Sequence, residues 1–399
     1  MNRRILWLLL LLLSQCLLLT GCWSSSAIED LNMEVGVALD IADETEVEEK
    51  LKAADGSYPQ QHRFSCTYQF IVPQGAVGSK KEGSQSKNFY NMTETGDSVF
   101  EAVRELSLRT NRVPIGHHMK IIIIGEKLAR SVKLSELTDF FSRDNDIRPS
   151  VLLLVSRGKA RDVLNNALPG QTPAFVVEGI FGNQNRNTRI WQPVSLTKVL
   201  GPLHSKSSFV LQNIISSGTE SKFAGVGVIK GKTGLLGGFL DESQLEGLVW
   251  LTGKGQGGFL KTKDPETGKL LNYEIKSMDS TIKSNVKDGE ISFEVKVESA
   301  GRFAEVFDPG GERLDEAIIR RKEKVLQDHA EDLIRGTMNQ IQHELHADVA
   351  GFGTSLRIHH PAIWRKVKDD WDETFSAIPV TYKVKLNIEE YGASGTSAE

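Results

Sequence analysis

The sequence predicts a mixed α+β protein of more than one domain, with an N-terminal α/β part holding a mixed sheet and a C-terminal antiparallel sheet packed with a long helix. Apolar runs alternate with helical patterns over residues 97–166, and strand-like segments with turn signals follow residue 223. Apolar side chains recur at helical spacing over residues 313–348. At 399 residues the chain is also too long for one ordinary core.

The N-terminal part opens with two alternating segments, residues 34–41 and 63–72, which we expect to pair as an antiparallel hairpin. The charged residues 42–61 between them form the connection. Residues 73–96 are rich in Gly, Ser and Lys and contain little to bury, so most of this stretch is predicted to be a mobile loop.

A layered α/β pattern follows. A helix is expected after Asp97 or Ser98, and Met119 to Ile124 is a continuous apolar run closed by Gly125. Four isoleucines in a row leave no polar face, so this strand should be buried on both sides. The same pattern continues with a helix at 134–141, a strand at 151–155 and a helix at 159–166.

Residues 182–208 are rich in Asn, Gly, Ser and Pro, and the main domain boundary is placed just after them, near residues 210–220. The expected organisation is therefore a leader at residues 1–21, an N-terminal domain at 22–215, with two subdomains as an alternative, and a C-terminal domain at 220–399.

The C-terminal part is predicted from turn signals and alternation. A hairpin is expected around Gly231 to Gly234, and Lys287-Asp288-Gly289 is a second turn signal. The last helix, at 361–375, carries an aromatic stripe that includes Trp364 and Trp371; we interpret it as core packing, with a partner-subunit surface as the alternative. The remaining expected elements are a helix at 242–250, strands at 257–263, 270–278, 280–287 and 291–299, and a final strand at 378–389.

The first 21 residues have the features of an export leader. Two arginines precede an apolar run from Ile5 to Leu19, and Leu19-Thr20-Gly21-Cys22 resembles a bacterial lipobox, in which the cysteine thiol receives a diacylglyceryl group. Cys22 is therefore the expected lipidation site. An uncleaved signal anchor is the alternative, and both place the rest of the chain outside the cytoplasm.

Composition excludes several classes of function. The chain is 39% apolar and 25% charged, which is typical of a globular body. Loss of the leader leaves 46 basic and 52 acidic residues, a net charge of −6, so nucleic acid is not an expected partner. Cys66 would be the remaining free cysteine, and its alternation with Phe64 and Tyr68 predicts a buried strand position.

Motifs of catalysis and metal binding fail on inspection. Gly231-Lys232-Thr233 ends like a phosphate-binding loop, but the required glycine five residues earlier is Val226 and no helix is expected to follow. His343 and His346 lack the spacing of a zinc peptidase. Asp139, Asp144 and Asp146 are interpreted as a solvated helix end. The sequence thus predicts no enzyme activity, no metal and no cofactor other than the lipid.

Four segments carry a family resemblance. They are CWSSSAIEDL at 22–31, VFEAVRELSLRTNRVPIGHHMKIIIIGEKLA at 99–129, FFSRDNDIRPSVLLLVSRGKARDVL at 140–164, and DVAGFGTSLRIHHPAIWRKVKDDWDETFSAIPVTYKVKLNIEEYG at 348–392. Together, and in this order, they resemble the Ger(x)C lipoproteins, the C subunits of bacterial spore germinant receptors.

The resemblance implies a lipoprotein on the outer face of the spore inner membrane, assembled with an A subunit and a permease-like B subunit that respond to nutrients. Cys22 matches the acylated cysteine, which would carry the diacylglyceryl group and an N-acyl chain. Trp23 and His118 match family positions, as do Arg143 and Arg148 of an Arg-Asp-x-x-Ile-Arg segment. In the segment that follows the acylated cysteine, Ser24 and Ala27 stand where the family usually has acidic residues.

Local chemistry suggests structural roles for some matched residues. Gly351 and Gly353 flank Phe352, where a glycine with positive φ can end the long helix and allow Phe352 to fold back onto it. Arg143 and Arg148 are expected near an ion pair with Asp144 or Asp146.

These observations favour a non-enzymatic receptor subunit that stabilises or couples the complex. A solute-binding lipoprotein that serves a transporter is the alternative, and it would need a cleft between two similar lobes. An envelope hydrolase is a further alternative, and it would need clustered titratable groups.

Overall fold

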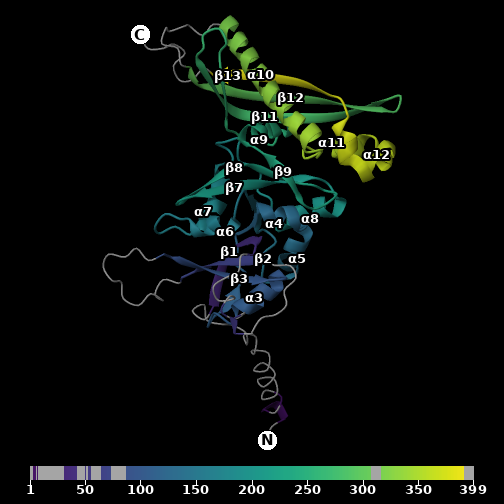
Figure 1. Ribbon diagram of the computed structural model, residues 1–399. Coiled ribbons are helices and arrows are strands. Elements are labelled where there is room, and N and C mark those ends of the chain that lie inside the picture. Colours follow the sequence, from purple (N-terminus) through teal and green to yellow (C-terminus); the bar gives the residue numbers. More distant parts are fainter. Residues whose placement is uncertain are drawn as a thin grey trace, which may run out of the picture.

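The computed structural model describes residues 31–42, 64–72, 87–306 and 316–390, with isolated positions at 3–5, 7, 50, 53 and 54. Cys22, Trp23 and most of the expected leader lie outside the described residues, as does the expected loop segment 73–86. The described chain forms two sheets with helices packed on them, and the second sheet lies at the opposite end of the molecule from α3 and β3 (Figure 1). The predicted mixed α/β fold class is confirmed.

The first sheet has nine strands, in the order β3-β2-β1-β5-β6-β7-β8-β9, with β4 paired to the start of β1. Its central strands are parallel and its outer strands antiparallel, and the expected antiparallel pairing of β1 with β2 is confirmed. The strands are β1 (Leu31–Ile41), β2 (Phe64–Ile71), β3 (Phe89–Gly96), β4 (Val113–Ile115), β5 (Ile121–Gly125), β6 (Leu152–Ser156), β7 (Phe209–Ser217), β8 (Glu220–Ile229) and β9 (Leu236–Leu240).

Helices cover both faces of this sheet, as the isoleucine run predicted. Ile122 and Ile124 pack in one apolar cluster, and Ile121 and Ile123 pack in another on the opposite face. The first cluster contains residues of α3 (Val99–Leu106), α4 (Glu126–Ser131), α5 (Leu134–Arg143) and α8 (Leu196–Ser205), and the second contains residues of α6 (Ala160–Asn165) and α7 (Pro173–Ile180).

Two segments predicted as loops contain regular structure. Residues 89–96, within the expected loop, form the edge strand β3, because pairing with β2 lets Phe89 pack in the interior despite the polar sequence around it. Helix α8 lies within the region rich in Asn, Gly, Ser and Pro. The Ser195 hydroxyl caps its start, and Leu196 and Val199 bury one face of it although Pro202 lies inside the helix.

The expected boundary at residues 210–220 covers most of β7, the turn after it and the first residue of β8. Both strands belong to the first sheet, which extends on to β9. The residues that resembled a phosphate-binding loop form the turn between β8 and β9: Gly234 has φ +71° and donates its N–H to the Lys230 carbonyl (2.7 Å). The hairpin interpretation is therefore confirmed.

The second sheet has the order β10-β11-β12-β13, with α9 and α10 contributing to the core beneath it. In Figure 1, α10 crosses the long strands and α11 and α12 lie at its end. Its elements are α9 (Glu242–Thr252), β10 (Phe259–Lys263), β11 (Leu270–Lys287), β12 (Glu290–Val306), α10 (Glu316–Asn339), α11 (Phe352–His359), α12 (Pro361–Val367), α13 (Trp371–Ser376) and β13 (Val380–Glu390).

Three expectations for this part are corrected. The sheet is not wholly antiparallel, because β13 runs parallel to β12 after the chain has crossed over through the helices. The two strands expected at 270–278 and 280–287 are the single strand β11. The helix expected at 361–375 is broken by a 3-10 turn at residues 368–370.

Candidate functional site

The long helix ends differently from its prediction, and this ending builds the site. One π-helical turn, Gln340–Glu344, follows α10, and the Leu345 N–H donates to the Gln340 carbonyl (2.8 Å). His346 then takes a left-handed conformation with φ +45°. The helix therefore stops before residue 348, the expected end, and the chain turns towards the first sheet.

Asp348 holds the turn that follows. Its Oδ1 accepts the backbone N–H groups of Ala350 (3.2 Å), Gly351 (2.8 Å) and Phe352 (3.1 Å), and its Oδ2 accepts that of Gly353 (2.6 Å). Burial raises the pKa of this carboxyl above its usual value, although these hydrogen bonds act in the opposite direction. The carboxylate thus fixes the start of α11, where Gly351 has φ +96°. The positive φ was expected at this glycine, but its expected role is wrong, because the long helix already ends at His346 and Gly351 begins the next helix.

Trp371 supplies a fifth hydrogen-bond donor to the Asp348 carboxylate. Its indole Nε1–H donates to Oδ2 of Asp348 (2.8 Å), and the nearly buried ring packs against Trp364, with ring centroids 5.2 Å apart. Phe352 is fully buried between Phe293 (5.0 Å) and Phe375 (5.1 Å). The interpretation of this aromatic stripe as core packing is confirmed, and the three candidates Phe352, Trp364 and Trp371 belong to one cluster.

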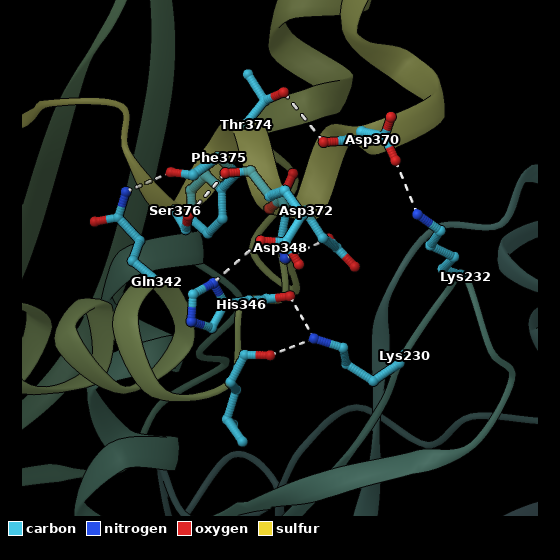
Figure 2. Close-up of polar contacts among 12 residues, drawn as sticks. Lys230, Lys232, Gln342, His346, Asp348, Asp370, Asp372, Thr374, Phe375 and Ser376 are labelled. Carbon is cyan, nitrogen blue, oxygen red and sulfur yellow. Dashed lines mark hydrogen bonds and ion pairs between the residues drawn. The ribbon is translucent and has the colours of Figure 1, made fainter.

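Polar contacts connect this C-terminal turn to the first sheet (Figure 2). Asp372 accepts the backbone N–H of Asp348 at Oδ1 (3.0 Å) and the Ser208 hydroxyl at Oδ2 (2.7 Å). The ammonium of Lys230 donates to the carbonyls of Leu345 and His346, the latter at 2.6 Å. Nearby, Lys232 pairs with Asp370 (2.8 Å) across the surface. We call this set the junction; it consists of Ser208, Lys230, Lys232, Leu345, His346, Asp348, Asp370 and Asp372.

The other predicted candidates, His118, Arg143 and Arg148, make none of the contacts of the junction. His118 and Arg148 are exposed. The expected ion pair of Arg143 with Asp144 or Asp146 is wrong: its guanidinium pairs with Asp139 (2.9 Å), one turn earlier on α5. The carboxylate of Asp144 instead accepts the backbone N–H of Asp146 (2.9 Å) and closes the turn after α5.

Two buried acids on β1 were not singled out from the sequence. Asp40 accepts the N–H groups of Ala160 (2.7 Å) and Arg161 (2.9 Å), so it caps the N-terminus of α6 from the end of β1. Glu34 is 5% exposed, and burial, reinforced by the charges of Asp144 and Asp146, raises its pKa to about 8. The segment matched to the family thus surrounds a carboxyl group that is protonated at neutral pH.

The chemistry of these groups is structural. The oxygens of Asp348 accept five N–H donors between them, and those of Asp40 accept two. Within the described part of the chain, no group of three His, Cys, Asp or Glu side chains could hold a metal ion. Nor does any helix described here have both the length and the apolar character needed to cross a membrane.

Sequence reasoning missed Asp348, Asp372 and the lysines of the junction. A signal for Asp348 was present, since an Asp followed within five residues by two glycines favours a turn built on side-chain acceptance of backbone N–H groups. The partners Ser208 and Lys230 carry no such signal, because they lie more than 100 residues earlier and reach the turn only through the fold.

Comparison with known proteins defines the class. The family model described as "Spore germination protein N-terminal domain" matches residues 24–216, and that described as "Spore germination B3/ GerAC like, C-terminal" matches residues 224–392. The second match contains the complete C-terminal half of the junction. The chain is therefore a spore germination protein of two family domains.

Individual relatives and a solved structure agree. "Spore germination protein YndF" of Bacillus subtilis (strain 168) is 38% identical over 389 residues, 96% of each chain. "Spore germination protein B3" of the same organism is 28% identical over 382 residues, 95% of this chain and 96% of that one. The crystal structure of the GerBC protein is 26% identical, with a TM-score of 0.61, and the match covers 89% of this chain and 97% of that one. The chain belongs to the Ger(x)C family, the germinant receptor C subunits.

Proposed function

We propose that the protein is a lipid-anchored, non-enzymatic subunit of a nutrient germinant receptor, held by Cys22 on the outer face of the spore inner membrane. Its role is to stabilise or couple the complex of A and B subunits. The observation that carries this proposal is the similarity to spore germination proteins along nearly the whole chain, combined with the lipobox-like Leu19-Thr20-Gly21-Cys22 at its start.

An anchor gives weak protein contacts a large effect. One acyl chain binds a bilayer marginally, whereas the diacylglyceryl group with an N-acyl chain on Cys22 gives stable attachment. Confining this subunit and its partners to one membrane surface raises their effective concentration, so modest interfaces suffice for assembly.

The junction suits a structural subunit, because it fixes the C-terminal turn to residues beside the first sheet. Lys230, which directly follows β8, binds the His346 carbonyl. Ser208, which directly precedes β7, binds Asp372, and the segment that these two residues reach is packed on the aromatic cluster beneath the second sheet. Because five hydrogen bonds from its own segment saturate the buried Asp348 carboxylate, it fixes this turn rather than offering a free base. This arrangement favours a coupling subunit over a hydrolase.

The alternative of a solute-binding lipoprotein is less well supported. Such a protein needs a cleft between two similar lobes, and the two sheets here differ in strand number, order and direction. A hollow of about 190 Å³ beside the α6–α7 connection lies in the part of the chain built on the first sheet. Another of about 410 Å³, beside Gln342 and Tyr382, lies in the part built on the second sheet. Neither hollow lies between these two parts.

Substitution of the anchor tests the proposal. Cys22→Ala should release the protein from the membrane into the soluble fraction of spore extracts and strongly reduce germination with nutrients. Germination with a trigger that bypasses nutrient receptors should be unchanged. Cys16→Ala, in the leader itself, is the matched control and should behave as wild type in both assays.

The proposal would be contradicted by a Cys22→Ala strain that responds normally to every nutrient although its protein is no longer lipidated. Membrane loss without any defect in germination would disprove the tether. Retention on the membrane together with a germination defect would instead indicate an uncleaved anchor.

A further inference from the structure

Residues 107–113, which we call the α3–β4 connection, join α3 to the first residue of β4 and present two exposed apolar side chains. Leu108 is 79% exposed and Val113 is 64% exposed, the two highest fractions among the large hydrophobic residues of the chain described from residue 31 onwards. Single exposed apolar residues are common, but two of this exposure within six consecutive positions form a feature that calls for a partner.

This connection is held rigidly. The Asn32 side-chain amide donates to the Thr110 hydroxyl (2.5 Å) and to the Arg112 carbonyl (3.4 Å), so the turn is fixed to β1. The Arg109 guanidinium binds the Thr93 carbonyl (2.7 Å) and the Glu94 carboxylate (2.8 Å) on the edge strand β3. The two apolar side chains therefore project from an ordered surface.

The position of this surface indicates its partner. Val113 is the strand partner of Leu31, the first residue of β1. Leu31 follows Cys22 by nine residues, which span about 30 Å at full extension. A lipid on Cys22 would therefore keep this surface within about 30 Å of the bilayer. The second sheet lies at the other end of the molecule (Figure 1).

We propose that the α3–β4 connection is a membrane-contact surface that inserts Leu108 and Val113 into the interface of the bilayer to which the chain is tethered. This inference rests on the proposed lipid anchor. Phe100, on the preceding helix, is 51% exposed and carries the Arg104 guanidinium 4.8 Å from its ring centre, an arrangement that suits the interfacial region.

The contact is apolar rather than electrostatic. Residues 99–113 contain three arginines and two glutamates, and Arg109 is already paired with Glu94. The surface therefore has little net charge. Insertion of the apolar side chains, with the tether holding them close, supplies the attraction and orients the body relative to the membrane.

Lipid-borne quenchers test the proposal in the lipidated full-length protein. A fluorescent probe is attached to Leu108→Cys, to Val113→Cys or to the control Ile358→Cys, which is 63% exposed on α11. After reconstitution into nanodiscs of phosphatidylglycerol and phosphatidylethanolamine, quenching by nitroxide headgroups is measured. The labelling is selective, because Cys66 is fully buried and burial raises its thiol pKa, and because Cys22 would be a thioether.

The probes at 108 and 113 should be quenched about threefold or more relative to the probe at 358, because an interfacial group lies about 5–10 Å into the headgroup region. Equal quenching at all three positions would overturn the proposal. The proposal would also be overturned if the fluorescence of the probe at position 108 changed only when the other receptor subunits were added, since that result indicates a protein partner. Protein that elutes free of nanodiscs would instead disprove the anchor, and with it the basis of this inference.

Discussion

The carboxylate of Asp348 offers a sharp test of how the C-terminal turn is held. In Asp348→Asn, the oxygen is best placed towards the three N–H groups of residues 350–352, which puts the amide NH₂ against the N–H groups of Gly353 and Trp371. Two buried donors then lose their acceptor and face another donor.

The magnitude follows from the number of donors. Each buried unsatisfied donor costs roughly 1–3 kcal/mol, and part of that is offset because the neutral amide removes a carboxylate whose burial is unfavourable. We expect a loss of about 3 kcal/mol in the free energy of unfolding. At a typical denaturant slope of about 1–3 kcal/mol per molar urea, the midpoint falls by about 1 M or more.

Urea unfolding followed by tryptophan fluorescence measures this loss, since Trp364 and Trp371 report on the same cluster. Asp370→Asn is the matched control: it removes only an exposed pair with Lys232, which solvent screens, so its urea midpoint should stay close to that of the wild type. If both variants unfold at the wild-type midpoint with unchanged slope, the five-donor carboxylate does not hold this turn and the reasoning is refuted.

Three further substitutions test the buried acids and the close packing. Glu34 has a pKa of about 8 in the folded state against 4.5 when exposed, so between these pH values the folded state binds one more proton than the unfolded state. The free energy of unfolding of the wild type should therefore fall by up to about 5 kcal/mol as the pH rises from 4.5 to 8. Glu34→Gln should remove most of this pH dependence of unfolding. A slope that persists in the variant would show that another group is responsible. Gly353→Ala places a Cβ 2.6 Å from the Trp371 indole nitrogen and should lower the stability measured by thermal unfolding by about 1–3 kcal/mol. The control Gly336→Ala, in open space on α10, should raise the stability by about 0.5–1 kcal/mol. Equal effects of the two substitutions would argue against the tight contact at Gly353. Asp40→Ala should cost at least about 1–2 kcal/mol and speed hydrogen exchange at the start of α6, and unchanged exchange there would exclude the capping role.

Local signals accounted for much of the first sheet. The isoleucine run of β5 has no polar face, and the structure buries it between helices on both sides. Ser98 caps α3 through its side chain, as expected of a Ser before an amphipathic helix. Asp288 and Gly289 both have positive φ in the turn between β11 and β12, which the Asp-Gly pair predicts.

Other features depend on contacts that no local pattern encodes. Strand β3 is mostly polar and becomes a strand because β2 offers a free edge and Phe89 finds an interior site. The direction of β13 is set by the path of the chain through α10 to α13, and its alternation is the same for either direction. The π-helical turn after α10 follows a continuous helical pattern, so the sequence predicted a longer helix.

The candidate site was predictable only in part. The aromatic residues Trp364 and Trp371 were identified from their spacing; the structure places the Trp371 ring in the core and packs the partly buried Trp364 ring against it. Asp348 was within a quoted segment but was not singled out, since its role depends on five donors that converge only after folding. Arg143 was paired with the wrong acid because sequence proximity favoured Asp144, whereas helix geometry favours Asp139.

The central claim is that a lipid on Cys22 holds this receptor subunit on the membrane. Its most direct test is the intact mass of the N-terminal peptide of the mature protein isolated from spore membranes. The account predicts a peptide that begins at Cys22 and carries a diacylglyceryl thioether with an acylated amino group. A peptide that begins elsewhere, or one in which the Cys22 sulfur is unmodified, would contradict the account.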